Sequence, residues 1–224
     1  APPSGFLALC TNNLPEPAVT PSENFNPVIY TGDGSAQDIT TVGFQPDFTW
    51  IKNRSANDSH QLFDAVRGVT NVLSSDSTAA EAANDDTLTH FLSNGFTTGD
   101  DVVTNTNAEN YVAWNWKANG SGSSNTDGSI NTTKTSANVD AGFSIVSYTG
   151  TGANATVGHG LSKAPDFLVT KTRSHTGDWM VYYGDNTDFL KLNETNATED
   201  LAAVWNDTSP TNSVFSLGSN GDVN

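Results

Sequence analysis

The stretch YTGDGSAQDITTVGFQPDFTWIKNR, residues 30–54, decides the fold, because the chain repeats it as YTGTGANATVGHGLSKAPDFLVTKTR at residues 148–173. From the Pro-Asp-Phe triplet onward the copies keep one register: Pro46 corresponds to Pro165, an offset of 165 − 46 = 119. The same offset recurs at five further pairs: Lys52/Lys171, Arg54/Arg173, Leu73/Leu192, Phe96/Phe215 and Gly99/Gly218. An offset held without a gap over that distance predicts two copies of one folding unit.

The second copy is shorter than the first at its end. At this offset Asn105 corresponds to Asn224, so nothing in the chain corresponds to residues 111–116, YVAWNW, which we expect to form the last strand of the first copy. A sandwich without that strand exposes an unpaired edge. Residues 6–10 of a neighbouring chain, FLALC, have the alternation needed to fill it by strand addition. Alternatively, the missing residues follow in a longer parent chain, of which this sequence, beginning without Met, is expected to be a piece.

Short runs bounded by Gly, Asn and Pro predict strands in both copies. They are residues 27–31, 47–52 and 61–64 in the first copy, and 143–149, 167–171 and 178–183 in the second. The helical candidates are short. They are residues 78–83 and the matching segment of the second copy, residues 198–203. Close turns without alternating strands and helices favour antiparallel sandwiches.

The predicted fold is therefore all-β, with two tandem antiparallel β-sandwich repeats of the concanavalin or jelly-roll kind, the second lacking its last strand. Residues 1–22 hold the closing strand of a preceding module and a Pro-rich connector. The first repeat covers residues 23–118, a Gly/Ser/Asn-rich linker and lead-in covers 119–141, and the incomplete second repeat covers 142–224.

The net charge of −16, with only nine Lys plus Arg, argues against nucleic acid and against an anionic membrane as partners. No segment reaches the roughly 20 apolar residues of a membrane span. Cys10 is the single cysteine, so no intrachain disulfide can form and the fold must be held by packing and backbone pairing.

Residues shared by the copies are expected to serve the fold; Asp47, for example, could pair with Lys52 and Arg54. Positions that differ are better candidates for function. At three of them the second copy gathers aromatic residues that could stack on sugar rings, namely Trp179, Tyr182 and Tyr183 in place of His60, Phe63 and Asp64. The alternative is that Trp179 faces the core and Tyr182 only edges the sheet. Trp114 and Trp116 are expected in the core.

No catalytic or metal site is predicted. The four histidines, His60, His90, His159 and His175, lack metal-ligand spacing, and no nucleophile elbow or placed pair of carboxylates is evident. We therefore expect a protein that is not an enzyme and has no cofactor. Calcium has only weak support, from aspartates in predicted turns: Asp33, Asp38, Asp85, Asp86, Asp100 and Asp101.

The combined motifs GFLALCTNNLPEP, YTGDGS, GFQPDFTWIKNR, FDAVRG, YVAWNWKANG and SPTNSVFSLG resemble the repeat domain of structural proteins from marine bacteriophages. Such proteins are often described as tail-fibre or concanavalin-like lectin domain proteins. The resemblance implies a virion surface component on the extracellular particle, forming homo-oligomers that contact neighbouring virion proteins.

Within that resemblance we expect a tail-fibre or adhesin module that contacts host surface glycans, with weak contacts strengthened by multivalency. A purely structural capsid-decoration or fibre-shaft protein is the alternative. A polysaccharide depolymerase would require a pair of carboxylates in a groove, which the sequence does not reveal.

Overall fold

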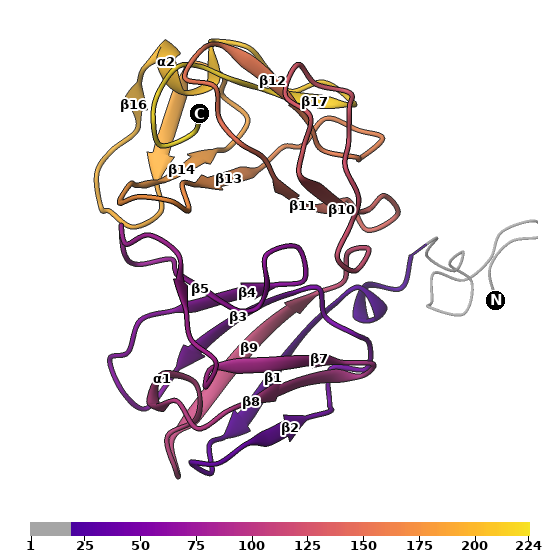
Figure 1. Cartoon of the computed structure of the whole chain (residues 1–224), viewed down its shortest axis with the longest axis vertical. Coiled ribbons are helices and arrows are strands. Elements are labelled where there is room, and N and C mark those ends of the chain that lie inside the picture. The colour runs from indigo at the N-terminus through magenta and orange to yellow at the C-terminus, as the bar shows by residue number, and fades with distance from the viewer. Residues whose placement is uncertain (1–18) are drawn as a thin grey trace, which may run out of the picture.

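The computed structural model describes residues 19–224 as antiparallel sheets in two halves that stack on one another (Figure 1). The predicted orphan strand at residues 6–10 and most of its connector lie outside the described residues. The all-β prediction is confirmed, and the arrangement is that of β-sandwiches. Neither helix of this part of the chain has the length and apolarity required to cross a membrane.

The N-terminal half is a sandwich of two sheets. A six-stranded sheet has the order β1-β9-β3-β4-β5-β6 and faces a three-stranded sheet, β2-β8-β7. The elements are η2 (Pro21–Glu23), β1 (Phe25–Thr31), β2 (Gln37–Ile39), β3 (Phe48–Asn53), β4 (Gln61–Asp64), β5 (Gly68–Ser74), β6 (Ala82–Ala83), β7 (Leu88–Leu92), β8 (Gly95–Thr98), α1 (Val102–Asn105) and β9 (Asn110–Trp116).

Alternation along the strands places one side chain in two in the core of this half. In β3 the residues Thr49, Ile51 and Asn53 are buried while their neighbours are half-exposed. A cluster between the two sheets is closed by large residues from several strands, including Val28, Tyr30, Ile51, Phe63, Phe96 and Tyr111. Burial of this apolar surface is the main favourable contribution to folding.

Strand β9 lies between β1 and β3 and pairs with both, so that Ala113 faces Val28 on one side and Ile51 on the other. Two backbone bonds, Gly32 N to Glu109 O and Lys117 N to Asn24 O, each 2.8 Å long, close the ends of the β1–β9 pair. Since alternate residues point their backbone groups to opposite edges, Pro27 of β1 faces away from β9. Proline has no N–H, so this outer edge of the sheet is where it fits.

The C-terminal half has three groups of paired strands. Their orders are β10-β11, β12-β17 and β13-β14-β15-β16. The elements are β10 (Lys134–Asn138), β11 (Phe143–Ser147), β12 (Ala155–Gly158), β13 (Leu168–Lys171), β14 (Trp179–Tyr182), β15 (Asp188–Lys191), β16 (Glu199–Asp200), α2 (Ala202–Trp205) and β17 (Val214–Leu217). A second core joins these groups, with Val157, Met180, Phe189, Val204 and Leu217 among its members.

The local structure departs from the expectations at three places. Residues 78–83 form no helix, and near the matching segment, residues 198–203, the chain forms only the single turn α2. Residues 119–141, expected as a linker and lead-in, contain a strand, β10, which pairs along the whole of β11. The helix α1 was missed; it begins at Asp101, whose carboxylate accepts a hydrogen bond from Val103 N at 2.8 Å. Such an N-cap can start a turn without any apolar periodicity.

Two isoleucines of the same large sheet provide a matched test of this core. Ile51 in β3 is 1% exposed, whereas Ile29 in β1 is 71% exposed. We expect Ile51→Ala to lower the free energy of unfolding by about 2–5 kcal/mol, because it leaves a cavity. Ile29→Ala should change it by less than about 0.5 kcal/mol. Chemical denaturation of both variants measures the difference, and equal effects would contradict the assigned faces of the sheet.

Candidate functional site: the junction between the two halves

The two halves meet through the outer faces of their sheets. Strands β4 and β5 lie beneath β13 and β14, so the chain forms stacked layers (Figure 1). Leu62 and Leu73 from the N-terminal half pack with Trp179 from the C-terminal half, and each is at most 6% exposed. Phe48, Trp50 and Val169 surround them. We call this contact, with the polar groups around it, the junction.

Trp179 anchors the junction. The residue is 6% exposed, and its indole N–H reaches Ser74 O at 2.9 Å and Ser77 O at 3.1 Å, both in the other half. Buried tryptophan contributes a large apolar surface and needs a partner for its N–H. Here both requirements are met across the junction rather than within its own half.

A row of aromatic rings extends the junction toward the start of β11. The ring of Trp116 lies 5.3 Å from Phe48 and 5.9 Å from Phe143, centroid to centroid. Trp114 and Trp116 are half-buried on the outer face of β9, whereas Tyr111, Ala113 and Asn115 fill the inner face. Both tryptophans lie on one face of β9, as expected, but that face is the outer one and not the face in the core between the two sheets.

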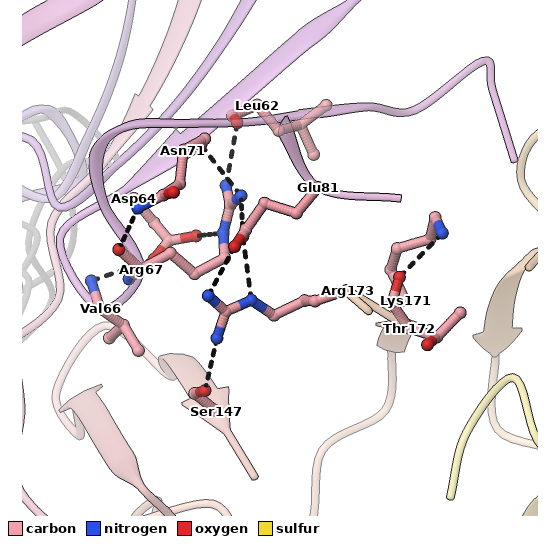
Figure 2. A network of polar contacts seen from close by, with 10 residues as sticks. All are labelled: Leu62, Asp64, Val66, Arg67, Asn71, Glu81, Ser147, Lys171, Thr172 and Arg173. Carbon is pink, nitrogen blue, oxygen red and sulfur yellow. Dashed lines mark hydrogen bonds and ion pairs between the residues drawn. The ribbon is translucent and has the colours of Figure 1, made fainter. Parts of the chain in front are cut away.

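Glu81 joins two arginines that come from opposite halves (Figure 2). Arg173 binds both oxygens of its carboxylate, Nη2 to Oε1 at 2.6 Å and Nε to Oε2 at 2.9 Å. Arg67 donates to Oε2 at 3.0 Å and is itself paired with Asp64. A bidentate contact between an arginine and a carboxylate, as Arg173 makes here, is strong and directional. Both oxygens of Glu81 are occupied, so the group acts as a clasp and not as an acid or base.

The loop before β6 carries this clasp and explains the missing helix. Glu81 N donates to Arg173 O at 3.0 Å, and Thr78 O accepts from Gly177 N at 2.9 Å and from Lys171 Nζ at 3.3 Å. Backbone groups that bind the other half cannot also form helical bonds. Local helix propensity, which contributes only a few tenths of a kcal/mol per residue, is outweighed.

The expected sugar-stacking residues do not form one platform. Trp179 is buried in the junction, and Tyr182 is 5% exposed in the core, 6.0 Å from Trp205. Tyr183 is 39% exposed, and its hydroxyl lies 3.5 Å from Asp188. Three aromatic residues that differ from their counterparts in the first copy suggested a binding surface. Trp179 is covered by the N-terminal half and Tyr182 points into the core, so of the three only Tyr183 is accessible.

Asp47 does not pair with Lys52 or Arg54 as expected. Its carboxylate is 3% exposed and accepts from Ala118 N at 2.8 Å, which fixes the chain as it leaves β9. Lys52 instead caps a turn through Asp58 O at 2.5 Å. The reason is alternation, since Asp47 lies on the opposite side of the strand end from these cations.

His159 is also structural. It is 3% exposed, its Nδ1 accepts from Leu161 N at 3.1 Å, and its Nε2 lies 3.2 Å from Thr211 O. These partners fit a neutral ring with the proton on Nε2, and burial lowers the pKa of His159. Within residues 19–224, no group of three or more His, Cys, Asp or Glu is placed to hold a metal ion.

The stability that the Glu81 clasp contributes should depend on pH. Burial raises the pKa of Glu81, but hydrogen bonds from Arg173 and Arg67 outweigh it and hold the pKa below its ordinary value. A folded-state pKa that is lowered contributes stability above the unfolded value, and this is lost as pH falls through the folded value. We expect Glu81→Gln to lower the free energy of unfolding by about 1–3 kcal/mol at pH 7. This difference should shrink as the pH falls below the ordinary pKa of a glutamate, roughly 4.3, and through the lower pKa of folded Glu81.

Chemical denaturation at several pH values measures the loss of unfolding free energy in Glu81→Gln. Glu23→Gln is the matched control, since Glu23 is exposed in η2. A loss that stays constant down to pH 3 would show that the charge of Glu81 is not what holds the clasp.

Comparison with known proteins adds a family but no activity. No curated protein and no solved structure matches the chain. Residues 20–224 match the family described as "Domain of unknown function (DUF7483)". Because this match spans most of the chain, the protein belongs to the DUF7483 family.

Proposed function

We propose that this chain is a structural module of a particle surface, in which two β-sandwich repeats serve as a rigid spacer. The junction carries the proposal. It commits Trp179, the aromatic row and the Glu81 clasp to holding the halves in one orientation. A spacer needs fixed geometry and a solvated surface, and this chain has both features, the latter through its net charge of −16.

The repeat arrangement is part of this proposal. Strand β17 lies 119 residues after β8 at both ends, and β13 and β15 fall in the same register relative to β3 and β5. The pairs β2-β8 and β12-β17 therefore occupy corresponding places in the two halves. We assign residues 23–118 and 142–224 to the two repeats.

The resemblance to marine bacteriophage structural proteins supports a place on the virion. The motifs that carry it fall on supporting elements of the fold: PDF opens β3 and FDAVRG joins β4 to β5. Such positions suit a module used for its shape. The chain would then work in several copies beside neighbouring virion proteins, without catalysis or a cofactor.

An adhesin that contacts host glycans is the second candidate. Tyr183 supports it, since this ring is 39% exposed at the end of β14 and lies beside the carboxylate of Asp188. An aromatic face with a neighbouring hydrogen-bond acceptor is a common arrangement for a sugar contact. One accessible ring offers little affinity alone, so this function would require many copies.

Immunogold labelling of intact particles with an antibody against this chain tests the proposal. We expect label along a fibre shaft or over the capsid shell, as a spacer or decoration protein requires. Label confined to fibre tips would favour the adhesin, and no label on any phage particle would overturn the virion assignment.

Glycan-array binding separates the two candidates. If the chain is a spacer, the purified protein should not bind glycans through Tyr183, so Tyr183→Ala should leave the array signal unchanged. The matched control is Tyr182→Phe, which keeps the buried ring and removes only its hydroxyl. Glycan binding that is lost in Tyr183→Ala and kept in Tyr182→Phe would establish the adhesin instead.

A further inference from the structure

The chain crosses from the N-terminal half to the C-terminal half after β9, where it leads into β10 (Figure 1). Both ends of this crossing are fixed by hydrogen bonds. Asn119 N donates to Ser136 Oγ at 2.8 Å, and further along Ser123 N donates to Thr135 O at 3.1 Å. Residues 119–122 therefore span two fixed points, and we call them the arch.

The turn inside the arch requires a glycine after Asn119. Gly122 N donates to Asn119 O at 3.3 Å and closes the turn, and Gly120, its first central residue, has a φ of +59°. Glycine adopts this left-handed conformation without steric cost. A Cβ at Gly120 would meet no heavy atom of the described residues within 4 Å beyond its chain neighbours, and Asn119 is exposed. The turn therefore presents an Asn-Gly pair in open surroundings.

An Asn-Gly pair can modify itself. The backbone nitrogen of the glycine attacks the side-chain amide carbon of the asparagine, and glycine favours this step because it has no side chain to hinder the approach. The attack requires a backbone N–H and a side-chain amide that are not held by hydrogen bonds. Within residues 19–224, neither Gly120 N nor the side-chain amide of Asn119 forms a hydrogen bond. Both reacting groups of the arch are therefore able to meet.

The Asn-Gly pair at residues 220–221 is held in place. The side-chain Oδ1 of Asn220 accepts from Asp222 N at 2.8 Å. Its backbone carbonyl accepts from Val223 N at 3.1 Å and from Asn224 N at 2.9 Å. The side-chain amide of Asn220 cannot turn toward Gly221 N without losing its bond to Asp222.

The pair at residues 94–95 is held by the hairpin of β7 and β8. Gly95 is buried and pairs with Leu92, which closes a two-residue turn. In such a hairpin the closing pair is joined by backbone hydrogen bonds, so the N–H of Gly95 is already engaged. Gly95 also lies directly against Ile39 O. Of the three Asn-Gly pairs in the described part of the chain, the pair in the arch is the one whose reacting groups are not held.

We propose that Asn119 is a site of spontaneous deamidation, which places a new carboxylate at the crossing between the halves. Gly120 N attacks Cγ of Asn119, the bond from Cγ to Nδ2 breaks, and ammonia leaves with the proton of Gly120 N. The product is a cyclic imide. Water then adds to one of its two carbonyl carbons and breaks the bond from that carbon to nitrogen, which leaves either an aspartate or an isoaspartate. The reaction consumes water and needs no enzyme, metal or oxidant.

The arch can accept either product. The bonds that fix its ends use backbone groups of Asn119 and Ser123 and not the side chain of Asn119. An isoaspartate adds one carbon to the main chain, and the open space around Gly120 accommodates it. Modified chains therefore keep their fold and carry one more negative charge at neutral pH. Neither step depends on where the chain lies in a particle.

Timed incubation of the whole chain at mildly alkaline pH, followed by tryptic peptide mapping, tests the proposal. Cleavage after Lys and Arg places the three Asn-Gly pairs in separate peptides, residues 68–117, 118–134 and 192–224. The other two pairs must break a hydrogen bond before they react, so we expect the acid form to appear about tenfold faster in 118–134. Fragment spectra should place the change at Asn119. Equal rates in the three peptides would overturn the proposal.

The denatured chain is the control for the effect of the fold. Without the hairpin of β7 and β8 and the bonds of Asn220, all three pairs should react at similar rates. If peptide 118–134 reacts in the denatured chain but stays unmodified in the folded chain, the arch shields Asn119 and the proposal is wrong.

Asn119→Gln is the matched variant, because its longer side chain closes the ring more slowly. Peptide 118–134 should then stay unmodified over the same period. A mass gain as fast as in the unaltered chain would assign the reaction to another asparagine and refute the site.

Asn119→Asp reproduces one product and tests whether the arch accepts it. We expect the Tm to change by less than about 2 °C, as for a substitution at an exposed position. A fall of more than about 5 °C would show that the modification disturbs the contact between the halves and that the arch does not accept it.

Discussion

The structure depends on the backbone pairing of β9 with both β1 and β3. Buried N–H and C=O groups need partners, and this one strand supplies them to two neighbours. Its inner face closes the core with Tyr111, Ala113 and Asn115, and its outer face carries Trp116 into the junction. One strand therefore links the core of the N-terminal half to the contact between the halves.

The strands of the chain were largely predictable, because β-strands leave a local signal. Residues 61–64 form β4 as predicted, and the strands expected at 47–52 and 143–149 were placed within one or two residues. The sequence offset of 119 residues helped, because a strand expected in one segment could be checked against the matching segment. Expected elements failed where the neighbour was distant in sequence, as in the loop at residues 78–83, whose backbone binds the other half.

The faces of the strands were harder to predict than the strands. Alternation separates two faces but does not say which is covered, and here the outer faces of β4, β9 and β14 are covered too. Trp114, Trp116 and Trp179 were misjudged for this reason. An aromatic residue that differs between copies suggests a ligand, but the same chemistry serves an internal contact equally well. No local pattern predicts that Trp179 donates to Ser74 and Ser77.

The few cations of the chain show how an acidic surface coexists with a fixed junction. Arg67 and Arg173 share Glu81, and Lys191 lies 3.0 Å from Asp178 and near two further carboxylates. Salt bridges at exposed sites contribute little, but Arg67 is only 7% exposed at its side chain, where screening by water is weak. Cations placed at buried contacts stabilise the fold while the remaining carboxylates keep the surface negative. Because the clasp and Trp179 bind groups of both halves, the folding of the C-terminal half is coupled to that of the N-terminal half.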